Sequence, residues 1–89
     1  MNEELLSPSK LEKEVNSSKL ILHNDDRNSF EWIILALTTI LNISTVNAEQ
    51  LAMIAHYKGK ATIKHGSEEQ LEEFRDSFSM LDVTTTVEK

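Results

Sequence analysis

The spacing of apolar residues along the chain predicts amphipathic helices separated by short strands. The clearest pattern runs from Phe30 to Leu41, where apolar side chains recur every three or four residues and share one face of a helix. Asn28 or Ser29 is the natural N-cap, and Glu31 is favourable in the first turn. The stripe consists of Phe30, Ile33, Ile34, Leu37 and Leu41.

A second helix is predicted to begin after Ser44 or Thr45, either of which can act as its N-cap. Gly59 stands where a left-handed residue would end this helix, which places His56 and Tyr57 in the last turn. One face carries small side chains, against which a neighbouring backbone or a ligand can come close. That face consists of Ala48, Leu51, Ala52 and Ala55, and we expect Met53 and Ile54 to widen it.

The segment from Ser67 to Gln70 matches the capping-box pattern that starts a third helix. Its solvent face carries five acidic residues against the single Arg75. Its apolar stripe is Leu71, Phe74, Phe78 and Leu81.

Short β-branched or aliphatic runs predict strands at 19–23, 61–64 and 83–87. The resulting order is β-α-α-β-α-β. A three-stranded antiparallel sheet covered on one side by the helices would bury every stripe, so the expected fold is an α+β two-layer sandwich.

The first 18 residues contain Pro8 together with several serines and asparagines, and apolar periodicity ends at Leu11. Such a segment buries too little to offset its ordering entropy, so a disordered N-terminal arm is expected before a core domain at 19–89. A passive tail is the alternative interpretation. The start has no apolar run long enough for a signal peptide or a membrane span, which predicts a cytoplasmic protein.

The balance of 15 acidic against 9 basic residues gives a net charge of -6 over 89 residues. Nucleic-acid and anionic-membrane surfaces need a basic footprint, so neither partner is expected. The chain has no cysteine, which leaves its three histidines as the only soft metal ligands.

No cofactor, metal or catalytic site is predicted. The oxygen-bearing positions within 24–28 resemble the start of a calcium loop, but Ser29 replaces the required glycine and Leu35 the bidentate glutamate. The histidines lack a paired zinc-ligand spacing. Ser29 and His56 could be proposed as nucleophile and base, but no glycines of a nucleophile elbow surround Ser29.

A polar cluster, Asn24-Asp25-Asp26, precedes the first helix and is expected at the mouth of the gap between the first two helices. Amide oxygen, carboxylate and neutral imidazole are all acceptors, so this cluster and His56 could together bind a cation with several N–H donors. The simpler interpretation makes the cluster a turn with a helix cap, and His56 a residue favoured by the helix dipole.

The same residues carry a resemblance to a known family. Asn24-Asp25-Asp26, followed by Phe30-Glu31-Trp32 and, thirty residues after Asp26, by the run from His56 to Lys60, closely resembles ClpS, the adaptor of the Clp AAA+ protease. The similarity is strong over residues 20–66 and looser to Lys89. It implies a small α/β sandwich that binds proteins with an N-terminal Leu, Phe, Tyr or Trp and delivers them to the unfoldase.

The resemblance also implies roles for particular side chains. The α-amino group of the substrate would be held by Asn24, Asp25, Asp26 and His56. The pocket for the first side chain would be lined by Asn28, Phe30, Ile33, Ala52, Ala55 and, from the last strand, Val83. Glu69 and Arg75 would face the N-terminal domain of the unfoldase. The N-terminal arm would enter the pore of the unfoldase.

This chain departs from the family pattern where the pocket is formed. Asn28-Ser29 stands where the family commonly has Thr-Pro, and Phe30 and Ala52 stand where it has methionine. Phe74 occupies the position of a lysine in the unfoldase-binding face. A monomeric adaptor is expected; the alternative is the same fold with another partner, as in a ribosomal-stalk-like or ligase-associated recognition domain.

Overall fold

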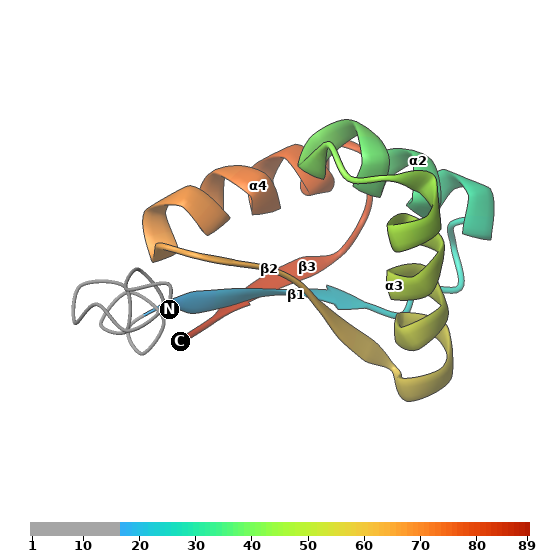
Figure 1. Ribbon diagram of the computed structural model, residues 1–89, viewed down its shortest axis with the longest axis horizontal. Coiled ribbons are helices and arrows are strands. Elements are labelled where there is room, and N and C mark those ends of the chain that lie inside the picture. Colours follow the sequence, from blue (N-terminus) through green and yellow to red (C-terminus); the bar gives the residue numbers. More distant parts are fainter. Residues whose placement is uncertain (1–16) are drawn as a thin grey trace, which may run out of the picture.

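The computed structural model describes residues 17–89 as an antiparallel sheet with helices packed on one face (Figure 1). The predicted fold class and element order are confirmed. The arm predicted at 1–18 lies outside the described residues except for Ser17 and Ser18. The elements are β1 (Ser18–His23), α2 (Phe30–Leu41), α3 (Thr45–Lys58), β2 (Lys60–Gly66), α4 (Glu68–Met80) and β3 (Thr85–Glu88).

The first strand, β1, is the centre of the sheet, whose strand order is β2-β1-β3. Leu22 pairs with Ala61 on one side and with Thr85 on the other, and both pairings are antiparallel. The pairing of β1 with β2 shifts after Leu20, which leaves Ile63 as the extra residue of a bulge. Because β1 has a partner along both edges, its ends are held firmly, and the loop that leaves it starts from a defined position.

The last strand begins later than predicted. Val83 and Thr84 belong to the connection from α4, and β3 starts at Thr85. The Val83 N–H donates to the Phe78 carbonyl at 3.0 Å, and Asp82 adopts a left-handed conformation with φ 61°. β-branched composition alone could not detect this turn, because it depends on a backbone hydrogen bond to the end of α4.

A serine hydroxyl caps the N-terminus of each of α2, α3 and α4. Ser29, Ser44 and Ser67 each accept a hydrogen bond at 3.1 Å from the backbone N–H three residues further on. Of the alternatives that the sequence left open, the structure therefore selects Ser29 for α2 and Ser44 for α3.

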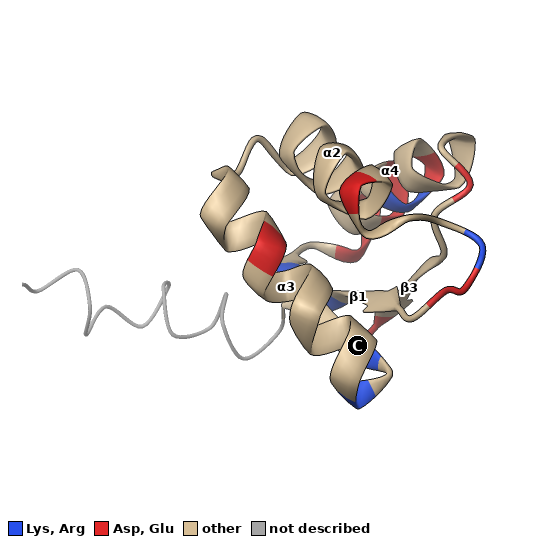
Figure 2. Cartoon of the chain, turned by 90° about the vertical axis from the view of Figure 1, so that its right-hand side faces the viewer, with Lys and Arg blue, Asp and Glu red and all other residues tan. Residues whose placement is uncertain are grey.

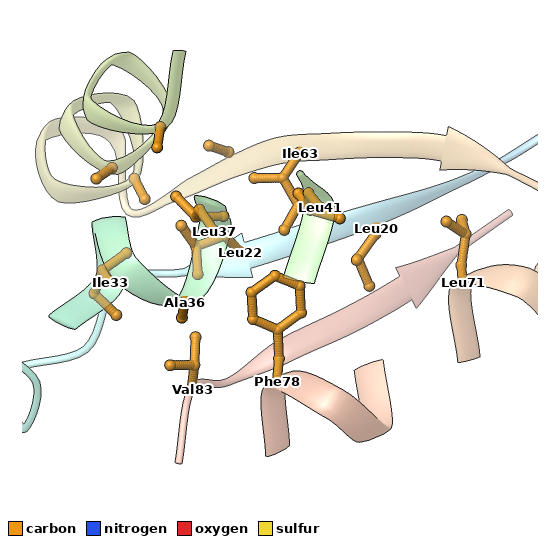
Figure 3. Packing of buried hydrophobic residues seen from close by; sticks show 14 residues of the cluster. Leu20, Leu22, Ile33, Ala36, Leu37, Leu41, Ile63, Leu71, Phe78 and Val83 are labelled. Carbon is orange, nitrogen blue, oxygen red and sulfur yellow. The ribbon is translucent and has the colours of Figure 1, made fainter. Parts of the chain in front are cut away.

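The core lies between β1 and the helices, and Phe78 of α4 occupies its middle (Figure 3). Full burial of such a side chain stabilises the fold by roughly 1.5–3 kcal/mol. The largest fully buried side chains are Leu20, Leu22, Leu37, Leu71 and Phe78.

The α3 helix contributes only alanines to the buried core, namely Ala48, Ala52 and Ala55, and its partly buried Leu51 packs against them. The expectation that Met53 and Ile54 widen the inward face is wrong, because their side chains are 49% and 42% exposed. Within residues 17–89, no helix combines the length and apolar character needed to cross a membrane.

Two neighbouring threonines of β3 provide a matched stability test. In the described part of the chain, the buried Thr85 hydroxyl has no hydrogen-bond partner, whereas the exposed Thr86 hydroxyl lies 2.7 Å from His23 Nε2. We expect Thr85→Val to raise the free energy of unfolding by about 1 kcal/mol, because it removes a buried unpaired polar group. Thr86→Val should give no gain. Urea denaturation measures both, and destabilisation by Thr85→Val would contradict the assignment.

Candidate functional site: a cavity between the β1–α2 loop and α3

A cavity of about 360 Å³ opens where the loop after β1, the start of α2 and the end of α3 meet. Nine of the ten residues predicted for the amino-group site and its pocket line it. Leu22 and His23, which the sequence did not suggest, line it as well. The full set is Leu22, His23, Asn24, Asp25, Asp26, Asn28, Phe30, Ile33, Ala52, Ala55 and His56.

Backbone hydrogen bonds bring the two sides of the cavity together. The Asn24 N–H donates to the Gly59 carbonyl at 2.9 Å, and the Gly59 N–H donates to the Ala55 carbonyl at 2.9 Å. Gly59 ends α3 with φ 91°, a conformation that a side chain disfavours. This turn places the last turn of α3, with His56, against the first loop residue after β1.

Asp25 is engaged inside the loop. One carboxylate oxygen accepts the Arg27 backbone N–H at 2.7 Å, and the other accepts the Asn28 side-chain amide at 2.7 Å. The side chain is only 6% exposed. The hydrogen bond from the Arg27 backbone is the main reason that the pKa of Asp25 is lowered, since it favours the charged carboxylate. Asp25 therefore acts as the organiser of the loop.

Three further contacts tie this loop and α2 to the turn between α4 and β3. The Asn28 amide donates to the Asp82 carbonyl at 2.8 Å, and the Arg27 guanidinium lies 3.3 Å from the Asp82 carboxylate. The Trp32 indole N–H donates to the Leu81 carbonyl at 2.9 Å. Because both amide hydrogens of Asn28 are used, its carbonyl oxygen is left as an acceptor. No sequence signal links Arg27 or Trp32 to a turn fifty residues away.

The mouth of the cavity carries several hydrogen-bond acceptors that have no partner among the described residues. Asn24, Asp26 and His56 are exposed, and within residues 17–89 their side chains make no hydrogen bond. The His56 ring packs edge-on against Tyr57, with 5.1 Å between the ring centroids. Figure 2 shows the acidic positions in the loop that leads from β1 into α2. This edge of the cavity is suited to a small cationic group with several donors.

The inner wall of the cavity is apolar. Ile33, Ala52 and Ala55 are buried, while Phe30 at the start of α2 remains 40% exposed. Two alanines on one side and an aromatic ring on the other leave space for an apolar side chain. The cavity therefore joins an apolar interior to an acceptor-rich mouth.

Val83 is not part of this cavity. Its side chain is buried in the core, and it lines a separate hollow beside α4 together with Arg75 and Asp82. The family resemblance implied that Val83 would reach the pocket from the last strand. The strand starts two residues later.

The two residues expected at the unfoldase interface lie on different sides of α4. Glu69 and Arg75 are six positions apart, which corresponds to about 120° around a helix. Arg75 is engaged within the helix, since its guanidinium lies 2.9 Å from the Glu72 carboxylate. Glu69 is exposed in the first turn, and Figure 2 shows further acidic positions over the same helix.

Two other chemistries considered from the sequence gain no support from the geometry. The Ser29 hydroxyl accepts the Trp32 backbone N–H at 3.1 Å and so serves as a helix cap. Among the described residues, no three His, Asp or Glu side chains gather in a way that could hold a metal ion.

Residues 13–81 match the sequence model of the family described as ATP-dependent Clp protease adaptor protein ClpS. The match covers more than half of the chain, and the protein belongs to the ClpS family. The resemblance carried by the Asn24 to Asp26 and His56 to Lys60 motifs is thereby confirmed at the level of the family.

The fold is similar to that of Agrobacterium tumefaciens ClpS2, solved bound to L-phenylalaninamide. The TM-score is 0.77 at 20% sequence identity, and the match covers 82% of this chain and 95% of the other. Comparison with curated proteins found no significant match.

Replacement of Asp25 by Asn should lower the free energy of unfolding at neutral pH by about 1 kcal/mol, because a charge-assisted acceptor is lost. The lowered pKa means that the carboxylate stabilises the native state above its ordinary value of 3.8 and loses this effect as the pH falls through the native pKa. The difference between wild type and variant should therefore shrink below about pH 4.

Urea denaturation between pH 7 and pH 2.5 measures this difference. Asp26→Asn is the control at pH 7, where it should change stability little because Asp26 is exposed. A wild-type advantage that stays constant into acid would show that the Asp25 carboxylate charge does not hold the loop.

Proposed function

We propose that this protein binds the free N-terminal residue of substrate proteins and delivers them to a Clp AAA+ unfoldase. The observation that carries this proposal is the junction of an apolar cavity with exposed acceptors from Asn24, Asp26 and His56 at its mouth. An N-terminal Leu, Phe, Tyr or Trp has the matching chemistry: an apolar side chain next to an ammonium group.

Both the ammonium group and the first side chain contribute to the binding energy. An ammonium offers three N–H donors, and charge-assisted hydrogen bonds contribute about 1.5–3 kcal/mol each. Burial of the first side chain against Ile33, Ala52 and Ala55 adds roughly 1.5–3 kcal/mol. The α-amino group has a pKa of roughly 7.7–8.0, so it is largely charged at neutral pH. Neither the ammonium group nor the first side chain alone suffices for tight binding, so the site would require both.

The hydrogen bonds within the loop suggest different roles for its acceptor residues. The Asp25 carboxylate already accepts hydrogen bonds from the Arg27 backbone and the Asn28 side chain. We assign it the role of positioning the loop, while Asn24, Asp26, His56 and the Asn28 carbonyl oxygen meet the ammonium. Phe30 would cover the first side chain at the rim.

The Agrobacterium tumefaciens relative supports this chemistry, since it was solved with L-phenylalaninamide, which carries a free amino group beside an aromatic side chain. Membership of the adaptor family supports the delivery step. We propose that the protein works as a cytoplasmic monomer and that the exposed Glu69 of α4 contacts the N-terminal domain of the unfoldase. Arg75 is a weaker candidate because Glu72 already neutralises it.

A peptide that begins with free Phe should bind, and the same peptide with an acetylated amino group should bind at least about a hundredfold more weakly. Acetylation removes the charge and two of the donors at the mouth of the cavity, a loss of about 3 kcal/mol or more. Fluorescence anisotropy with labelled peptides measures both affinities. Equal binding of the two peptides would exclude the proposed function.

Variants of the mouth locate the interaction. His56→Ala and Asp26→Ala should weaken binding of the free peptide about tenfold or more, because each removes an acceptor for the ammonium. His65→Ala, a change at an exposed histidine of β2 outside the cavity, is the matched control. Far-ultraviolet circular dichroism of all three variants should match the wild type.

Reversal of charge at Glu69 tests the delivery step separately. Glu69→Lys should reduce capture of the protein by an isolated unfoldase N-terminal domain and leave peptide affinity unchanged, since Glu69 lies on α4 outside the cavity. Glu49→Lys, at an exposed acidic position of α3 outside the cavity, controls for overall charge. No capture of the wild type would favour a different partner for this fold.

A further inference from the structure

We infer that the outer face of α3 is a second subsite, which binds apolar side chains at the second and fourth residues of the substrate. This inference rests on the proposed function, because it concerns the segment that follows the bound N-terminal residue. The inference extends the proposed function, because it predicts which side chains the substrate should carry after its first residue.

The α3 helix has an unusual distribution of side chains. Its fully buried residues are all alanines, with only the partly buried Leu51 beside them, whereas its outward face carries the large apolar residues Met53, Ile54 and Tyr57, which are between 42% and 76% exposed. The hydrophobic effect alone would favour the reverse arrangement. Large apolar side chains gathered on a surface mark an interaction site.

These side chains form one continuous strip. Gln50, Met53, Ile54 and Tyr57 follow a spacing of three and four residues, so they lie on the same side of the helix. Together with Lys58 they line a shallow, almost wholly apolar groove of about 440 Å³. In Figure 2, α3 is turned toward the viewer, and Glu49 is its one acidic position. An apolar and extended occupant fits such a surface.

The strip is continuous with the mouth of the cavity. Tyr57 packs edge-on against His56 at 5.1 Å, and His56 lines the cavity. A substrate whose ammonium lies at His56 therefore has its next residues within reach of Tyr57. This continuity identifies the occupant as the substrate itself.

The spacing of the strip sets the register. Tyr57 and Met53 are four positions apart, about 6 Å along a helix. In an extended peptide, side chains two positions apart lie on the same side and about 6.8 Å from each other. Residue two would then meet Tyr57 and residue four would meet Met53 and Ile54, while residue three would face solvent.

Three labelled peptides that share a free N-terminal Phe and a common tail test this inference. They begin Phe-Ser-Ser-Ser, Phe-Leu-Ser-Leu and Phe-Ser-Leu-Ser. Anisotropy titrations should show the peptide with leucine at positions two and four binding about three- to tenfold tighter than the all-serine peptide. Leucine at position three should give less than about a twofold gain. An equal gain from position three, or no gain from two and four, would overturn the inference.

Variants show whether α3 is responsible. Met53→Ser and Ile54→Ser should abolish the difference between the first two peptides, and Leu35→Ser, at an exposed leucine of α2, should preserve it. Persistence of the difference in the α3 variants would overturn the inference. So would sedimentation of the unliganded protein as a dimer that Met53→Ser dissociates, because a second copy would then be the occupant.

Failure of this inference is distinguishable from failure of the proposed function. If all three peptides bind equally and acetylation of their first residue still abolishes binding, only the second subsite is excluded. If acetylation has no effect, the primary site is excluded as well.

Discussion

The backbone pairing between Asn24 and Gly59 is the constraint on which the candidate site depends. It joins the end of the central strand to the end of α3, so that the loop acceptors and His56 lie across one opening. Gly59 can make this connection because it adopts φ 91° at the end of the helix. A residue with a side chain would strain this turn and displace His56 relative to Asn24. The geometry of the mouth therefore follows from a main-chain hydrogen bond rather than from the side chains that form it.

The loop between β1 and α2 separates two kinds of polar residue. Asp25 is engaged within the loop, where its carboxylate accepts hydrogen bonds from Arg27 and Asn28. Asn28, Arg27 and Trp32 then attach this loop to the turn before β3, which belongs to the opposite end of the sequence. Asn24 and Asp26 remain exposed beside them. A loop held in this way presents its free acceptors at low entropic cost to a ligand.

The composition of α3 connects stability to recognition. Its alanines allow the helix to lie close to the sheet and leave room for the cavity, but they bury little apolar surface. The core is therefore built mainly from the leucines of β1 and α2 and from Leu71 and Phe78 of α4 (Figure 3). Because other elements supply most of the buried apolar surface, the larger residues of α3 can face outward. In the proposed binding mode, α3 contacts the substrate on both of these faces.

Local patterns determined much of this protein. The helix stripes, the serine caps and the glycine after His56 are all short-range signals, because they depend on spacing within one or two turns. They were sufficient for the element order, the fold class and the two motifs that carry the family resemblance. The pairing of Asn24 with His56, in contrast, followed from the family resemblance, since spacing within one helix or strand does not show which elements face each other.

Tertiary structure decided the features that depend on distant parts of the chain. The apolar composition of Met53 and Ile54 could not reveal that they face solvent, because the sheet selects which side of α3 is buried. The position of Val83 in the core, away from the cavity, likewise depends on how α4 and the turn after it pack against the sheet. The anchoring of Trp32 on Leu81 and of Asn28 on Asp82 likewise requires partners that only the folded chain brings within reach. Sequence thus predicted most of the residues that surround the cavity, while packing added Leu22 and His23 and placed Val83 elsewhere.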